Sequence, residues 1–416
     1  MAKKIILFLS EVHPNSKEEK YACPTGEIIL GTQTNDAPVK YILMKEPEID
    51  EIKCIISKKA KESGILEHFT DEVHKVRENI KITVINYSEE EDFLSGPLSK
   101  VLTTISPGDE VYIDTTGGFR TSSVLLILIV QALKYKNVTL GGAVYSNYPA
   151  KRVEEVSKDY VLFDLINGLN EFATYGDCRT LINYAQTDKA MMDIVESLNR
   201  LTEDIKLCRT DVLEDRLKTL RSKLENAKKN GSPLVKAFVP LFESKFGKEL
   251  TIPSLIKWCS TNGLIEQALT IYTDRLPEYI FKNNIIAFNT NREAPKEDIP
   301  GQDKYYVLLN NGFLKQGGGK RRTLNNIGTY IMQGENAYGY SSLCPADKLG
   351  NFCVQYCYLQ KIRNQINHAD AQQKTNEGLD NIFMTYGLST RYKTMNITYI
   401  SGIVQKSVDL LVSLAR

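Results

Sequence analysis

Short apolar, β-branched runs alternate with amphipathic segments over the first 165 residues. The runs predict strands, and the segments between them predict helices. Strands are expected at Lys4–Leu9, Glu27–Gly31, Val39–Met44, Ile80–Asn86, Glu110–Asp114, Thr139–Tyr145 and Tyr160–Leu165. Helices are expected at Ile49–Ser63, Ile65–Glu78, Asp92–Ile105 and Thr121–Tyr135. This alternation predicts a doubly wound, Rossmann-like α/β domain over residues 1–166, with ligands bound outside the carboxyl ends of its strands.

The pattern becomes helical from about Asn167 onward. Apolar residues recur at helical spacing in two stretches, and a turn is expected at Asn230–Pro233. The two stripes are Met191, Ile194, Val195, Leu198, Leu201 and Ile205, and then Leu213, Leu217, Leu220 and Leu224. Polar loops are expected at Asn289–Gln302 and Leu314–Asn326. Residues 167–416 are therefore predicted to form a mainly α-helical region.

Charge and cysteine content narrow the classes of function. The 416 residues carry a formal net charge of +1, so a nucleic-acid site must be a local basic patch. The most apolar internal run, Val124–Val130, is far shorter than the roughly 20 residues that span a bilayer. The eight cysteines include no C-x-x-C pair, which disfavours a zinc site. Cys353 and Cys357 are expected to be buried rather than redox-active. We expect a cytoplasmic protein without membrane contact.

A strand followed by two threonines and two glycines offers the clearest ligand site. The glycines allow backbone N–H groups to approach a ligand, and the start of the next helix carries partial positive charge. The alternative is a plain strand–turn–helix connection in which Thr and Ser act as caps. The candidate ligand-binding residues in this turn are Thr115, Thr116, Gly117, Gly118, Arg120 and Thr121.

Two further loops carry groups suited to a nucleobase. Gly31–Val39 is rich in amides and hydroxyls, and Thr34 and Asn35 are its candidate ligand-binding residues. Tyr145–Tyr148 offers an aromatic face for stacking, with Asn147 as a candidate contact. An ordinary polar loop and a tyrosine packed at the edge of the sheet remain the alternatives. A basic loop at Gly317–Thr323 is not a P-loop, because Gly318 stands where the lysine should be.

The stretch from Gln360 to His368 places an arginine and an imidazole on one predicted helix. His368 is the only histidine after His74. Imidazole exchanges protons near neutral pH, and a guanidinium suits phosphate oxygens. Asn364 and His368 share a helical face, whereas Arg363 points elsewhere, so two copies of the helix would be needed to complete one site. The alternative is a surface ion pair and a histidine at a helix C-terminus.

Together these motifs resemble the CARF–HEPN ribonucleases of type III CRISPR systems. A Rossmann-like domain with Asp-Thr-Thr-Gly-Gly-x-Arg precedes a helical region that ends in Arg-Asn-x-x-x-His. The resemblance implies an allosteric cyclic oligoadenylate activator bound across a homodimer, with cyclic hexa-adenylate favoured over cyclic tetra-adenylate. It departs from the family at Ser10–Thr25, which is longer than the usual glycine-rich first loop.

The resemblance also implies metal-independent cleavage of single-stranded RNA, without a cofactor. The 2′-hydroxyl would attack phosphorus and leave a 2′,3′-cyclic phosphate and a 5′-hydroxyl. His368 would transfer protons, and Arg363 would stabilise charge on the phosphoryl oxygens. Asn364 would orient His368 or the phosphate. The activator would act through the helices of residues 167–229. A secondary ring nuclease activity would use Thr115, Thr116 or Asn147.

Two other classes compete with this interpretation. A ligand-sensing transcription regulator could bind DNA through a helix-turn-helix at Thr251–Leu269, although its second helix lacks Lys and Arg. A packed helical hairpin is the preferred interpretation of that stretch. A metal-dependent nuclease would need a carboxylate cluster, and the sequence shows no convincing one.

Overall fold

The structure is a computed structural model that describes residues 2–11, 16–88, 94–118, 121–185, 188–246, 249–288, 340–367, 377–391 and 395–415. The chain divides into two compact units, Met1–Asp164 and Leu165–Arg416. The long helix α6 (Ser157–Tyr175) contains the predicted boundary between residues 166 and 167. The polar loops predicted at Asn289–Gln302 and Leu314–Asn326, and the basic loop at Gly317–Thr323, lie outside the described residues.

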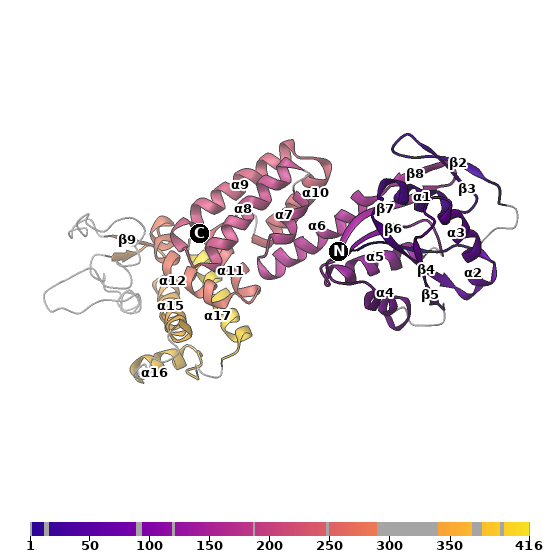
Figure 1. Ribbon diagram of the computed structural model, residues 1–416. Helices are drawn as coiled ribbons and strands as arrows, with labels where there is room; N and C mark the ends of the chain where they lie inside the picture. The colour runs from indigo at the N-terminus through magenta and orange to yellow at the C-terminus, as the bar shows by residue number, and fades with distance from the viewer. Residues whose placement is uncertain are drawn as a thin grey trace. The chain divides into compact units, whose positions relative to one another are not determined.

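The first unit is built on an eight-stranded mixed sheet in the order β3-β2-β8-β7-β6-β1-β4-β5 (Figure 1). Strands β7, β6, β1, β4 and β5 run parallel, whereas β8 is antiparallel to β7 and β3 is antiparallel to β2. The strands are β1 (Lys3–Phe8), β2 (Glu19–Ala22), β3 (Ile28–Gly31), β4 (Ile49–Ser57), β5 (Lys81–Tyr87), β6 (Glu110–Asp114), β7 (Thr139–Asn147) and β8 (Arg152–Glu155).

Helices cover both faces of this sheet, as a doubly wound fold requires. The face that carries Ile5 and Leu7 packs on α1 (Asp36–Lys45), α2 (Lys58–Glu62) and α3 (Ile65–His74). The opposite face carries Ile6 and Phe8 and packs on α4 (Ser99–Thr104), α5 (Ser122–Lys134) and Tyr160 of α6. Successive side chains of β1 point to opposite faces of the sheet, so they pack into two separate hydrophobic cores. The predicted fold class, a Rossmann-like α/β domain before a mainly helical region, is confirmed.

Three predicted elements of this unit are wrong in type. The predicted strand Val39–Met44 lies in helix α1, the predicted helix Ile49–Ser63 begins with strand β4, and the predicted strand Tyr160–Leu165 lies in helix α6. Periodicity cannot separate a short apolar run in a helix from one in a strand. Strand β4 is buried on both faces, and its charged Glu51 and Lys53 form an ion pair inside, which gave it an amphipathic pattern. The short strands β2 and β8 were missed because charged residues fill them.

The second unit is mainly helical, with one small pair of strands, β9 (Ile286–Phe288) and β10 (Tyr340–Ser342), among its described residues. Both predicted apolar stripes are buried, one on α8 and the other on α9, and the predicted turn separates α9 from α10. The remaining helices are α7 (Arg179–Ala185), α8 (Lys189–Lys206), α9 (Leu213–Asn230), α10 (Pro233–Phe246), α11 (Ile252–Thr261), α12 (Ile265–Lys282), α15 (Ala346–Asn367), α16 (Glu377–Thr385) and α17 (Ile397–Leu414), with a 3-10 turn, η2, at Thr210–Val212.

Helix α17 is the one described helix that is long and apolar enough to cross a membrane by composition. Its side chains also contact the interior of the helical unit. The Ser401 hydroxyl donates to the Ser260 carbonyl oxygen at 3.0 Å, and the hydroxyls of Ser407 and Tyr272 lie 2.5 Å apart. Because core helices of soluble proteins pass the same test of length and hydropathy, these contacts favour a core helix.

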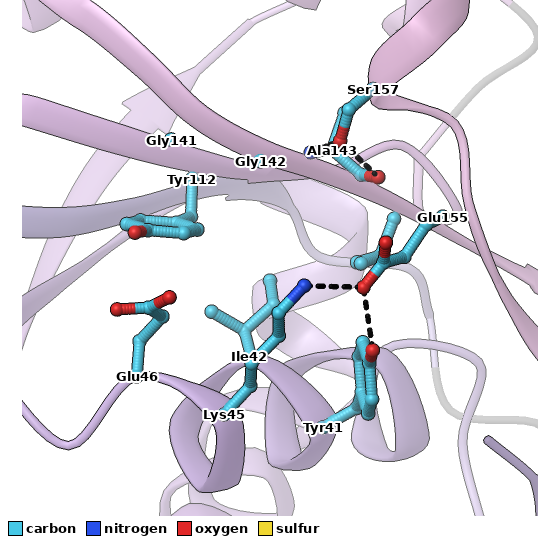
Figure 2. Close-up of a pocket in the computed structure, with 11 residues that line it drawn as sticks. Tyr41, Ile42, Lys45, Glu46, Tyr112, Gly141, Gly142, Ala143, Glu155 and Ser157 are labelled. Carbon is cyan, nitrogen blue, oxygen red and sulfur yellow. Dashed lines mark hydrogen bonds and ion pairs between the residues drawn. The ribbon is translucent and has the colours of Figure 1, made fainter. Parts of the chain in front are cut away.

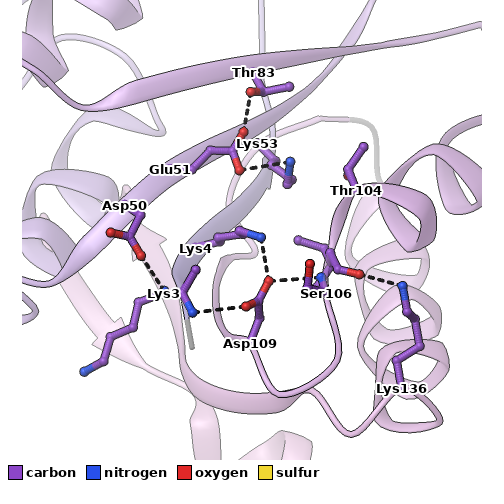
Figure 3. Close-up of polar contacts among 12 residues, drawn as sticks. Lys3, Lys4, Asp50, Glu51, Lys53, Thr83, Thr104, Ser106, Asp109 and Lys136 are labelled. Carbon is purple, nitrogen blue, oxygen red and sulfur yellow. Dashed lines mark hydrogen bonds and ion pairs between the residues drawn. The ribbon is translucent and has the colours of Figure 1, made fainter.

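Buried charges in the first unit are paired near the amino ends of the parallel strands (Figure 3). The Lys4 ammonium donates to Asp109 at 2.5 Å, and the backbone N–H groups of Ala2 and Ser106 donate to the same carboxylate at 3.0 Å. Burial raises the pKa of Asp109, but these three donors outweigh it and hold the pKa below the ordinary value of 3.8. The carboxylate therefore ties the start of β1 to the turn before β6.

Asp109 is expected to contribute stability that depends on pH. Because its pKa is lower in the folded chain, the contribution is present above about pH 4 and is lost as the pH falls through the folded pKa. Asp109→Asn should lower the free energy of unfolding at pH 7 by about 1–3 kcal/mol and reduce its change below pH 4. Urea unfolding at pH 7 and pH 3 measures both, with Glu48→Gln at an exposed site as the control. Equal pH dependence in Asp109→Asn and the parent would contradict this assignment.

Candidate functional site

A buried carboxylate, Asp114, marks the carboxyl end of β6. It accepts hydrogen bonds from the Thr116 backbone N–H at 2.9 Å, the Thr116 hydroxyl at 2.5 Å and the Asn35 amide at 2.6 Å. Burial raises its pKa to about 6, although these hydrogen bonds oppose the rise. Asp114 thus organises the turn of the predicted ligand site rather than facing a ligand itself.

Asn35 joins three segments that are far apart in the sequence. Its side-chain N–H groups donate to Asp114 and, at 3.2 Å, to the carbonyl oxygen of Phe8 at the end of β1. Its side-chain oxygen accepts from the Ser10 backbone at 3.2 Å and from the Gln33 amide at 2.9 Å. Two of the predicted ligand loops therefore meet the end of β1 at this one fully buried side chain.

The two glycines of the turn allow it to pack against β1. A Cβ atom on Gly117 would lie 2.0 Å from the Phe8 carbonyl oxygen and 2.5 Å from the Asn35 amide. Gly118 has φ +87°, and a Cβ atom there would lie 2.2 Å from the Ser122 hydroxyl. Its exposed N–H donates to the Ser10 hydroxyl at 2.9 Å. Only glycine fits both positions, because the backbone itself approaches its neighbours.

Several polar atoms around this turn are buried without a hydrogen-bond partner among the described residues. They are the Thr34 hydroxyl oxygen, one carboxylate oxygen of Asp36 and the Ser146 hydroxyl oxygen. The other Asp36 oxygen accepts from the Thr32 and Gln33 backbone N–H groups at 2.9 Å and lies 3.1 Å from His68 Nε2. Unsatisfied buried polar groups are costly, so their grouping is typical of a site completed by a polar ligand.

The remaining predicted ligand residues differ in their exposure and in whether their side chains already form hydrogen bonds within the protein. Thr121 is exposed just before α5, whereas the Thr115 hydroxyl donates to the Val144 carbonyl oxygen at 3.0 Å. The Asn147 amide donates to Glu154 at 2.9 Å and its oxygen accepts from Ala150 at 3.2 Å, so it stabilises the β7–β8 hairpin. Arg120 lies outside the described residues.

A lysine side chain contacts one face of Tyr148, a ring in the predicted stacking loop. The Lys151 ammonium lies 3.4 Å from the centre of the Tyr148 ring, so it occupies one face of a ring that is otherwise half exposed. Sequence reasoning named the loops that contain Gln33, Asp36 and Ser146 but did not choose these residues, and it missed Ser10. Ser10 and Ser146 come at the carboxyl ends of β1 and β7, and that position alone could have marked them.

A cavity elsewhere in the first unit was not predicted (Figure 2). It lies between the C-terminal half of α1 and strands β6 to β8. The Lys45 ammonium and the Tyr41 hydroxyl both donate to the Glu155 carboxylate, at 2.5 and 2.6 Å. Lys45 and Glu155 therefore neutralise each other, and the second carboxylate in the lining, Glu46, pairs with Lys3 outside it.

In the second unit, Arg363 and Asn364 lie on α15, as predicted. Phe352, Tyr356 and Leu359 form a fully buried stripe on this helix, and Arg363 continues it with a half-buried side chain. Arg363 Nη2 lies 3.9 Å from an Asp274 carboxylate oxygen on α12, whereas its buried Nε has no hydrogen-bond partner among the described residues. His368, which follows α15, lies outside the described residues.

The stretch weighed as a helix-turn-helix forms the packed hairpin α11–α12. The Thr251 and Ser254 side chains form a capping box at the start of α11, and Gly263 has φ +76° in the turn. Most of α12 is buried, including its charged Arg275 and Glu278. A recognition helix needs an exposed face for DNA, which α12 lacks. Among the described residues, no group of three His, Cys, Asp or Glu side chains is placed to hold a metal ion. Cys353 is fully buried and Cys357 partly so.

Comparison with known proteins identifies CRISPR-associated relatives. Residues 161–252 match the family model of the second domain of CRISPR-associated protein MJ1674. That protein, from Methanocaldococcus jannaschii, is 24% identical over 387 residues, which cover 86% of this chain and 52% of the relative. The chain thus spans about half the length of this relative. The solved structure of Enterococcus italicus Csm6 bound to cyclic hexa-2′-fluoro-hexa-dAMP aligns over 99% of this chain and 100% of that chain, with 13% identity and a TM-score of 0.40, too low to bear on fold or function.

These matches show what the chain resembles. The chain resembles a CRISPR-associated protein over most of its length, which confirms the resemblance to CRISPR-associated proteins inferred from its motifs. The HEPN ribonuclease part of that resemblance stays a prediction. The relative in this match is the MJ1674 protein, whose second-domain model runs from within α6 through α10 to the first residue of α11.

A single methyl group at Gly117 should disrupt the predicted ligand turn. Gly117→Ala is expected to lower the free energy of unfolding of the first unit by about 2–4 kcal/mol, because the new Cβ displaces the β1 carbonyl or Asn35. Gly402→Ala is the control, since a Cβ there meets nothing within 4 Å and alanine favours a helix. Chemical unfolding followed by hydrogen exchange measures both variants. A stable Gly117→Ala protein with native protection at β1 and β6 would contradict the close contact.

Proposed function

We propose that this chain is a cytoplasmic prokaryotic endoribonuclease of CRISPR antiviral defence, activated by a cyclic oligoadenylate and independent of metal ions. The observation that carries the proposal is the Arg363 guanidinium. It is half-buried on α15, its Nε is free of partners among the described residues, and it lies five residues before the lone imidazole of the C-terminal region. A guanidinium so placed is suited to phosphate oxygens.

The carboxyl edge of the first unit's sheet supports an activator site. The exposed Gly118 turn, the Thr121 hydroxyl and the unsatisfied groups at Thr34 and Ser146 gather polar atoms outside the ends of β1, β6 and β7. Parallel sheets of this type bind ligands at that edge. Cyclic hexa-adenylate is the preferred activator in this proposal.

The cleavage reaction needs only groups on this chain and its copy. The 2′-hydroxyl of single-stranded RNA loses its proton to an imidazole and attacks the adjacent phosphorus. The 5′-oxygen leaves with a proton from the second imidazole, which gives a 2′,3′-cyclic phosphate and a 5′-hydroxyl end. His368 of each copy supplies the proton transfers. Arg363 stabilises the charge that builds on the phosphoryl oxygens, and Asn364 orients the histidine or the phosphate.

A homodimer is part of the proposal, because Arg363 and His368 diverge around one helix and need a second copy to enclose a phosphate. The activator would favour the cleaving form through its higher affinity for that form. A secondary ring nuclease activity at Thr115 or Thr116 remains a proposal of the same kind. Asn147 is less suited to it, because both polar atoms of its amide bind the β7–β8 hairpin.

Fluorogenic single-stranded RNA tests the proposal directly. We expect cleavage in EDTA with cyclic hexa-adenylate and little without it. His368→Ala and Arg363→Ala should each reduce the rate by about 10²–10⁴-fold, because each removes a group that acts in the transition state. Arg200→Ala, at an exposed arginine on α8, is the matched control and should retain full activity. Full activity of His368→Ala, or loss of activity in EDTA, would refute the proposed chemistry.

A further inference from the structure

Asp274 is the acidic side chain that faces the proposed catalytic arginine. Its carboxylate oxygen lies 3.9 Å from Arg363 Nη2 and pairs residue 363 on α15 with residue 274 on α12. The two side chains have similar exposure, 24% for Arg363 and 29% for Asp274, so the pair is neither deeply buried nor fully solvated. Its charge therefore affects the guanidinium more than a fully solvated carboxylate would.

The helices that carry the pair are fixed to one another beside it. The Tyr356 hydroxyl donates to the Thr273 carbonyl oxygen at 2.7 Å. Thr273 is the residue before Asp274 on α12, and Tyr356 lies two helical turns before Arg363 on α15. The rings of Tyr272 and Tyr356 stack with their centres 5.6 Å apart. Because these contacts are buried, the separation between Asp274 and Arg363 is set by the core of the helical unit.

Two hydroxyl groups also hold the Asp274 carboxylate. It accepts from the Thr210 hydroxyl at 3.3 Å and from the Thr273 hydroxyl at 3.4 Å. Burial raises the pKa of Asp274, and the charge of Arg363 opposes the rise. The neighbouring Arg275 pairs instead with Glu278 and Glu214. The carboxylate is thus placed to face Arg363, but at 3.9 Å it does not form a close bidentate pair with it.

We propose that Asp274 is a positioning residue for Arg363 and that it also lowers the affinity of the site for RNA. In the absence of RNA the carboxylate holds the side chain of Arg363 toward α12 and partly neutralises it. A phosphate then binds the accessible N–H groups of the guanidinium, while Asp274 keeps its plane in place. This inference rests on the proposed ribonuclease function.

The inference predicts that binding and catalysis change in opposite directions. Asp274→Asn keeps the shape of the side chain and removes its negative charge. RNA should bind about two- to fivefold more tightly, since a partly exposed ion pair no longer competes with the phosphate. The kcat should fall about tenfold or more, because a guanidinium that is less well oriented stabilises the transition state poorly. A role limited to stability would lower both binding and kcat.

The experiment uses the full chain with cyclic hexa-adenylate. RNA affinity is measured by fluorescence anisotropy in a His368→Ala background, where cleavage is blocked, and kcat and KM are measured with His368 intact. Asp274→Glu should restore most of the kcat. Asp193→Asn is the matched control, because Asp193 forms a similarly exposed pair with Lys223 at 3.3 Å and should leave both quantities unchanged.

Distinct outcomes separate this inference from the proposed function. If the parent cleaves RNA and Asp274→Asn matches it in affinity and kcat, Asp274 has no positioning role. Weaker binding together with a lower kcat and a lower melting temperature would also overturn the inference, in favour of a structural role. If the parent binds RNA without cleaving it, the proposed enzyme activity is wrong. Tighter RNA binding by Asp274→Asn would then still support the inference that Asp274 lowers the RNA affinity of the site. A parent that neither binds nor cleaves RNA would overturn both.

Discussion

The hydrogen bonds between Asn35 and its neighbours hold the first unit's candidate site together. One buried amide joins the end of β1, the loop before α1 and the turn after β6. Without it, Asp114 would be a buried carboxylate with fewer donors, and the Gly117–Gly118 turn would lose the surface against which it packs. Buried polar networks are stabilising only when their members are satisfied, and the unsatisfied atoms here lie around this network at Thr34, Asp36 and Ser146. The candidate site is thus hydrogen-bonded at Asn35 and surrounded by buried polar atoms without a partner among the described residues, as expected for the binding of a polar ligand.

The helical unit follows a different principle. Its proposed site depends on Arg363, which lies at the end of a buried apolar stripe. Aromatic packing among Tyr272, Phe352 and Tyr356 therefore fixes the start of this side chain. In our proposal, the carboxylate of Asp274 then orients the guanidinium. Placing a permanent cation beside a fixed core is a general way to obtain a preorganised group for phosphate chemistry.

Much of the fold could be predicted from sequence, and the errors have physical causes. The stripes of α8 and α9 were recognised because amphipathic helices show their period directly. Strand β4 was not, because its buried Glu51 and Lys53 imitate a solvated face. The turn at Thr115–Gly118 was predicted from its glycines. Arg363 was predicted as a site residue because it lies five residues before His368. The contacts of Asn147 with Glu154, and of Asp274 with Arg363, depend on tertiary packing that no local pattern reveals.

The order of the strands has a consequence for how the chain acquires its fold. The hairpin of β2 and β3 lies at one edge of the sheet, and β2 pairs with β8, so residues near position 20 depend on residues near position 152. During synthesis this hairpin can find its neighbour only after most of the first unit has left the ribosome. Loop closure over such a separation is slow, and an unpaired edge invites association with other chains. β2 and β8 are rich in charged residues, which keep an unpaired strand soluble until the other strand has been synthesised.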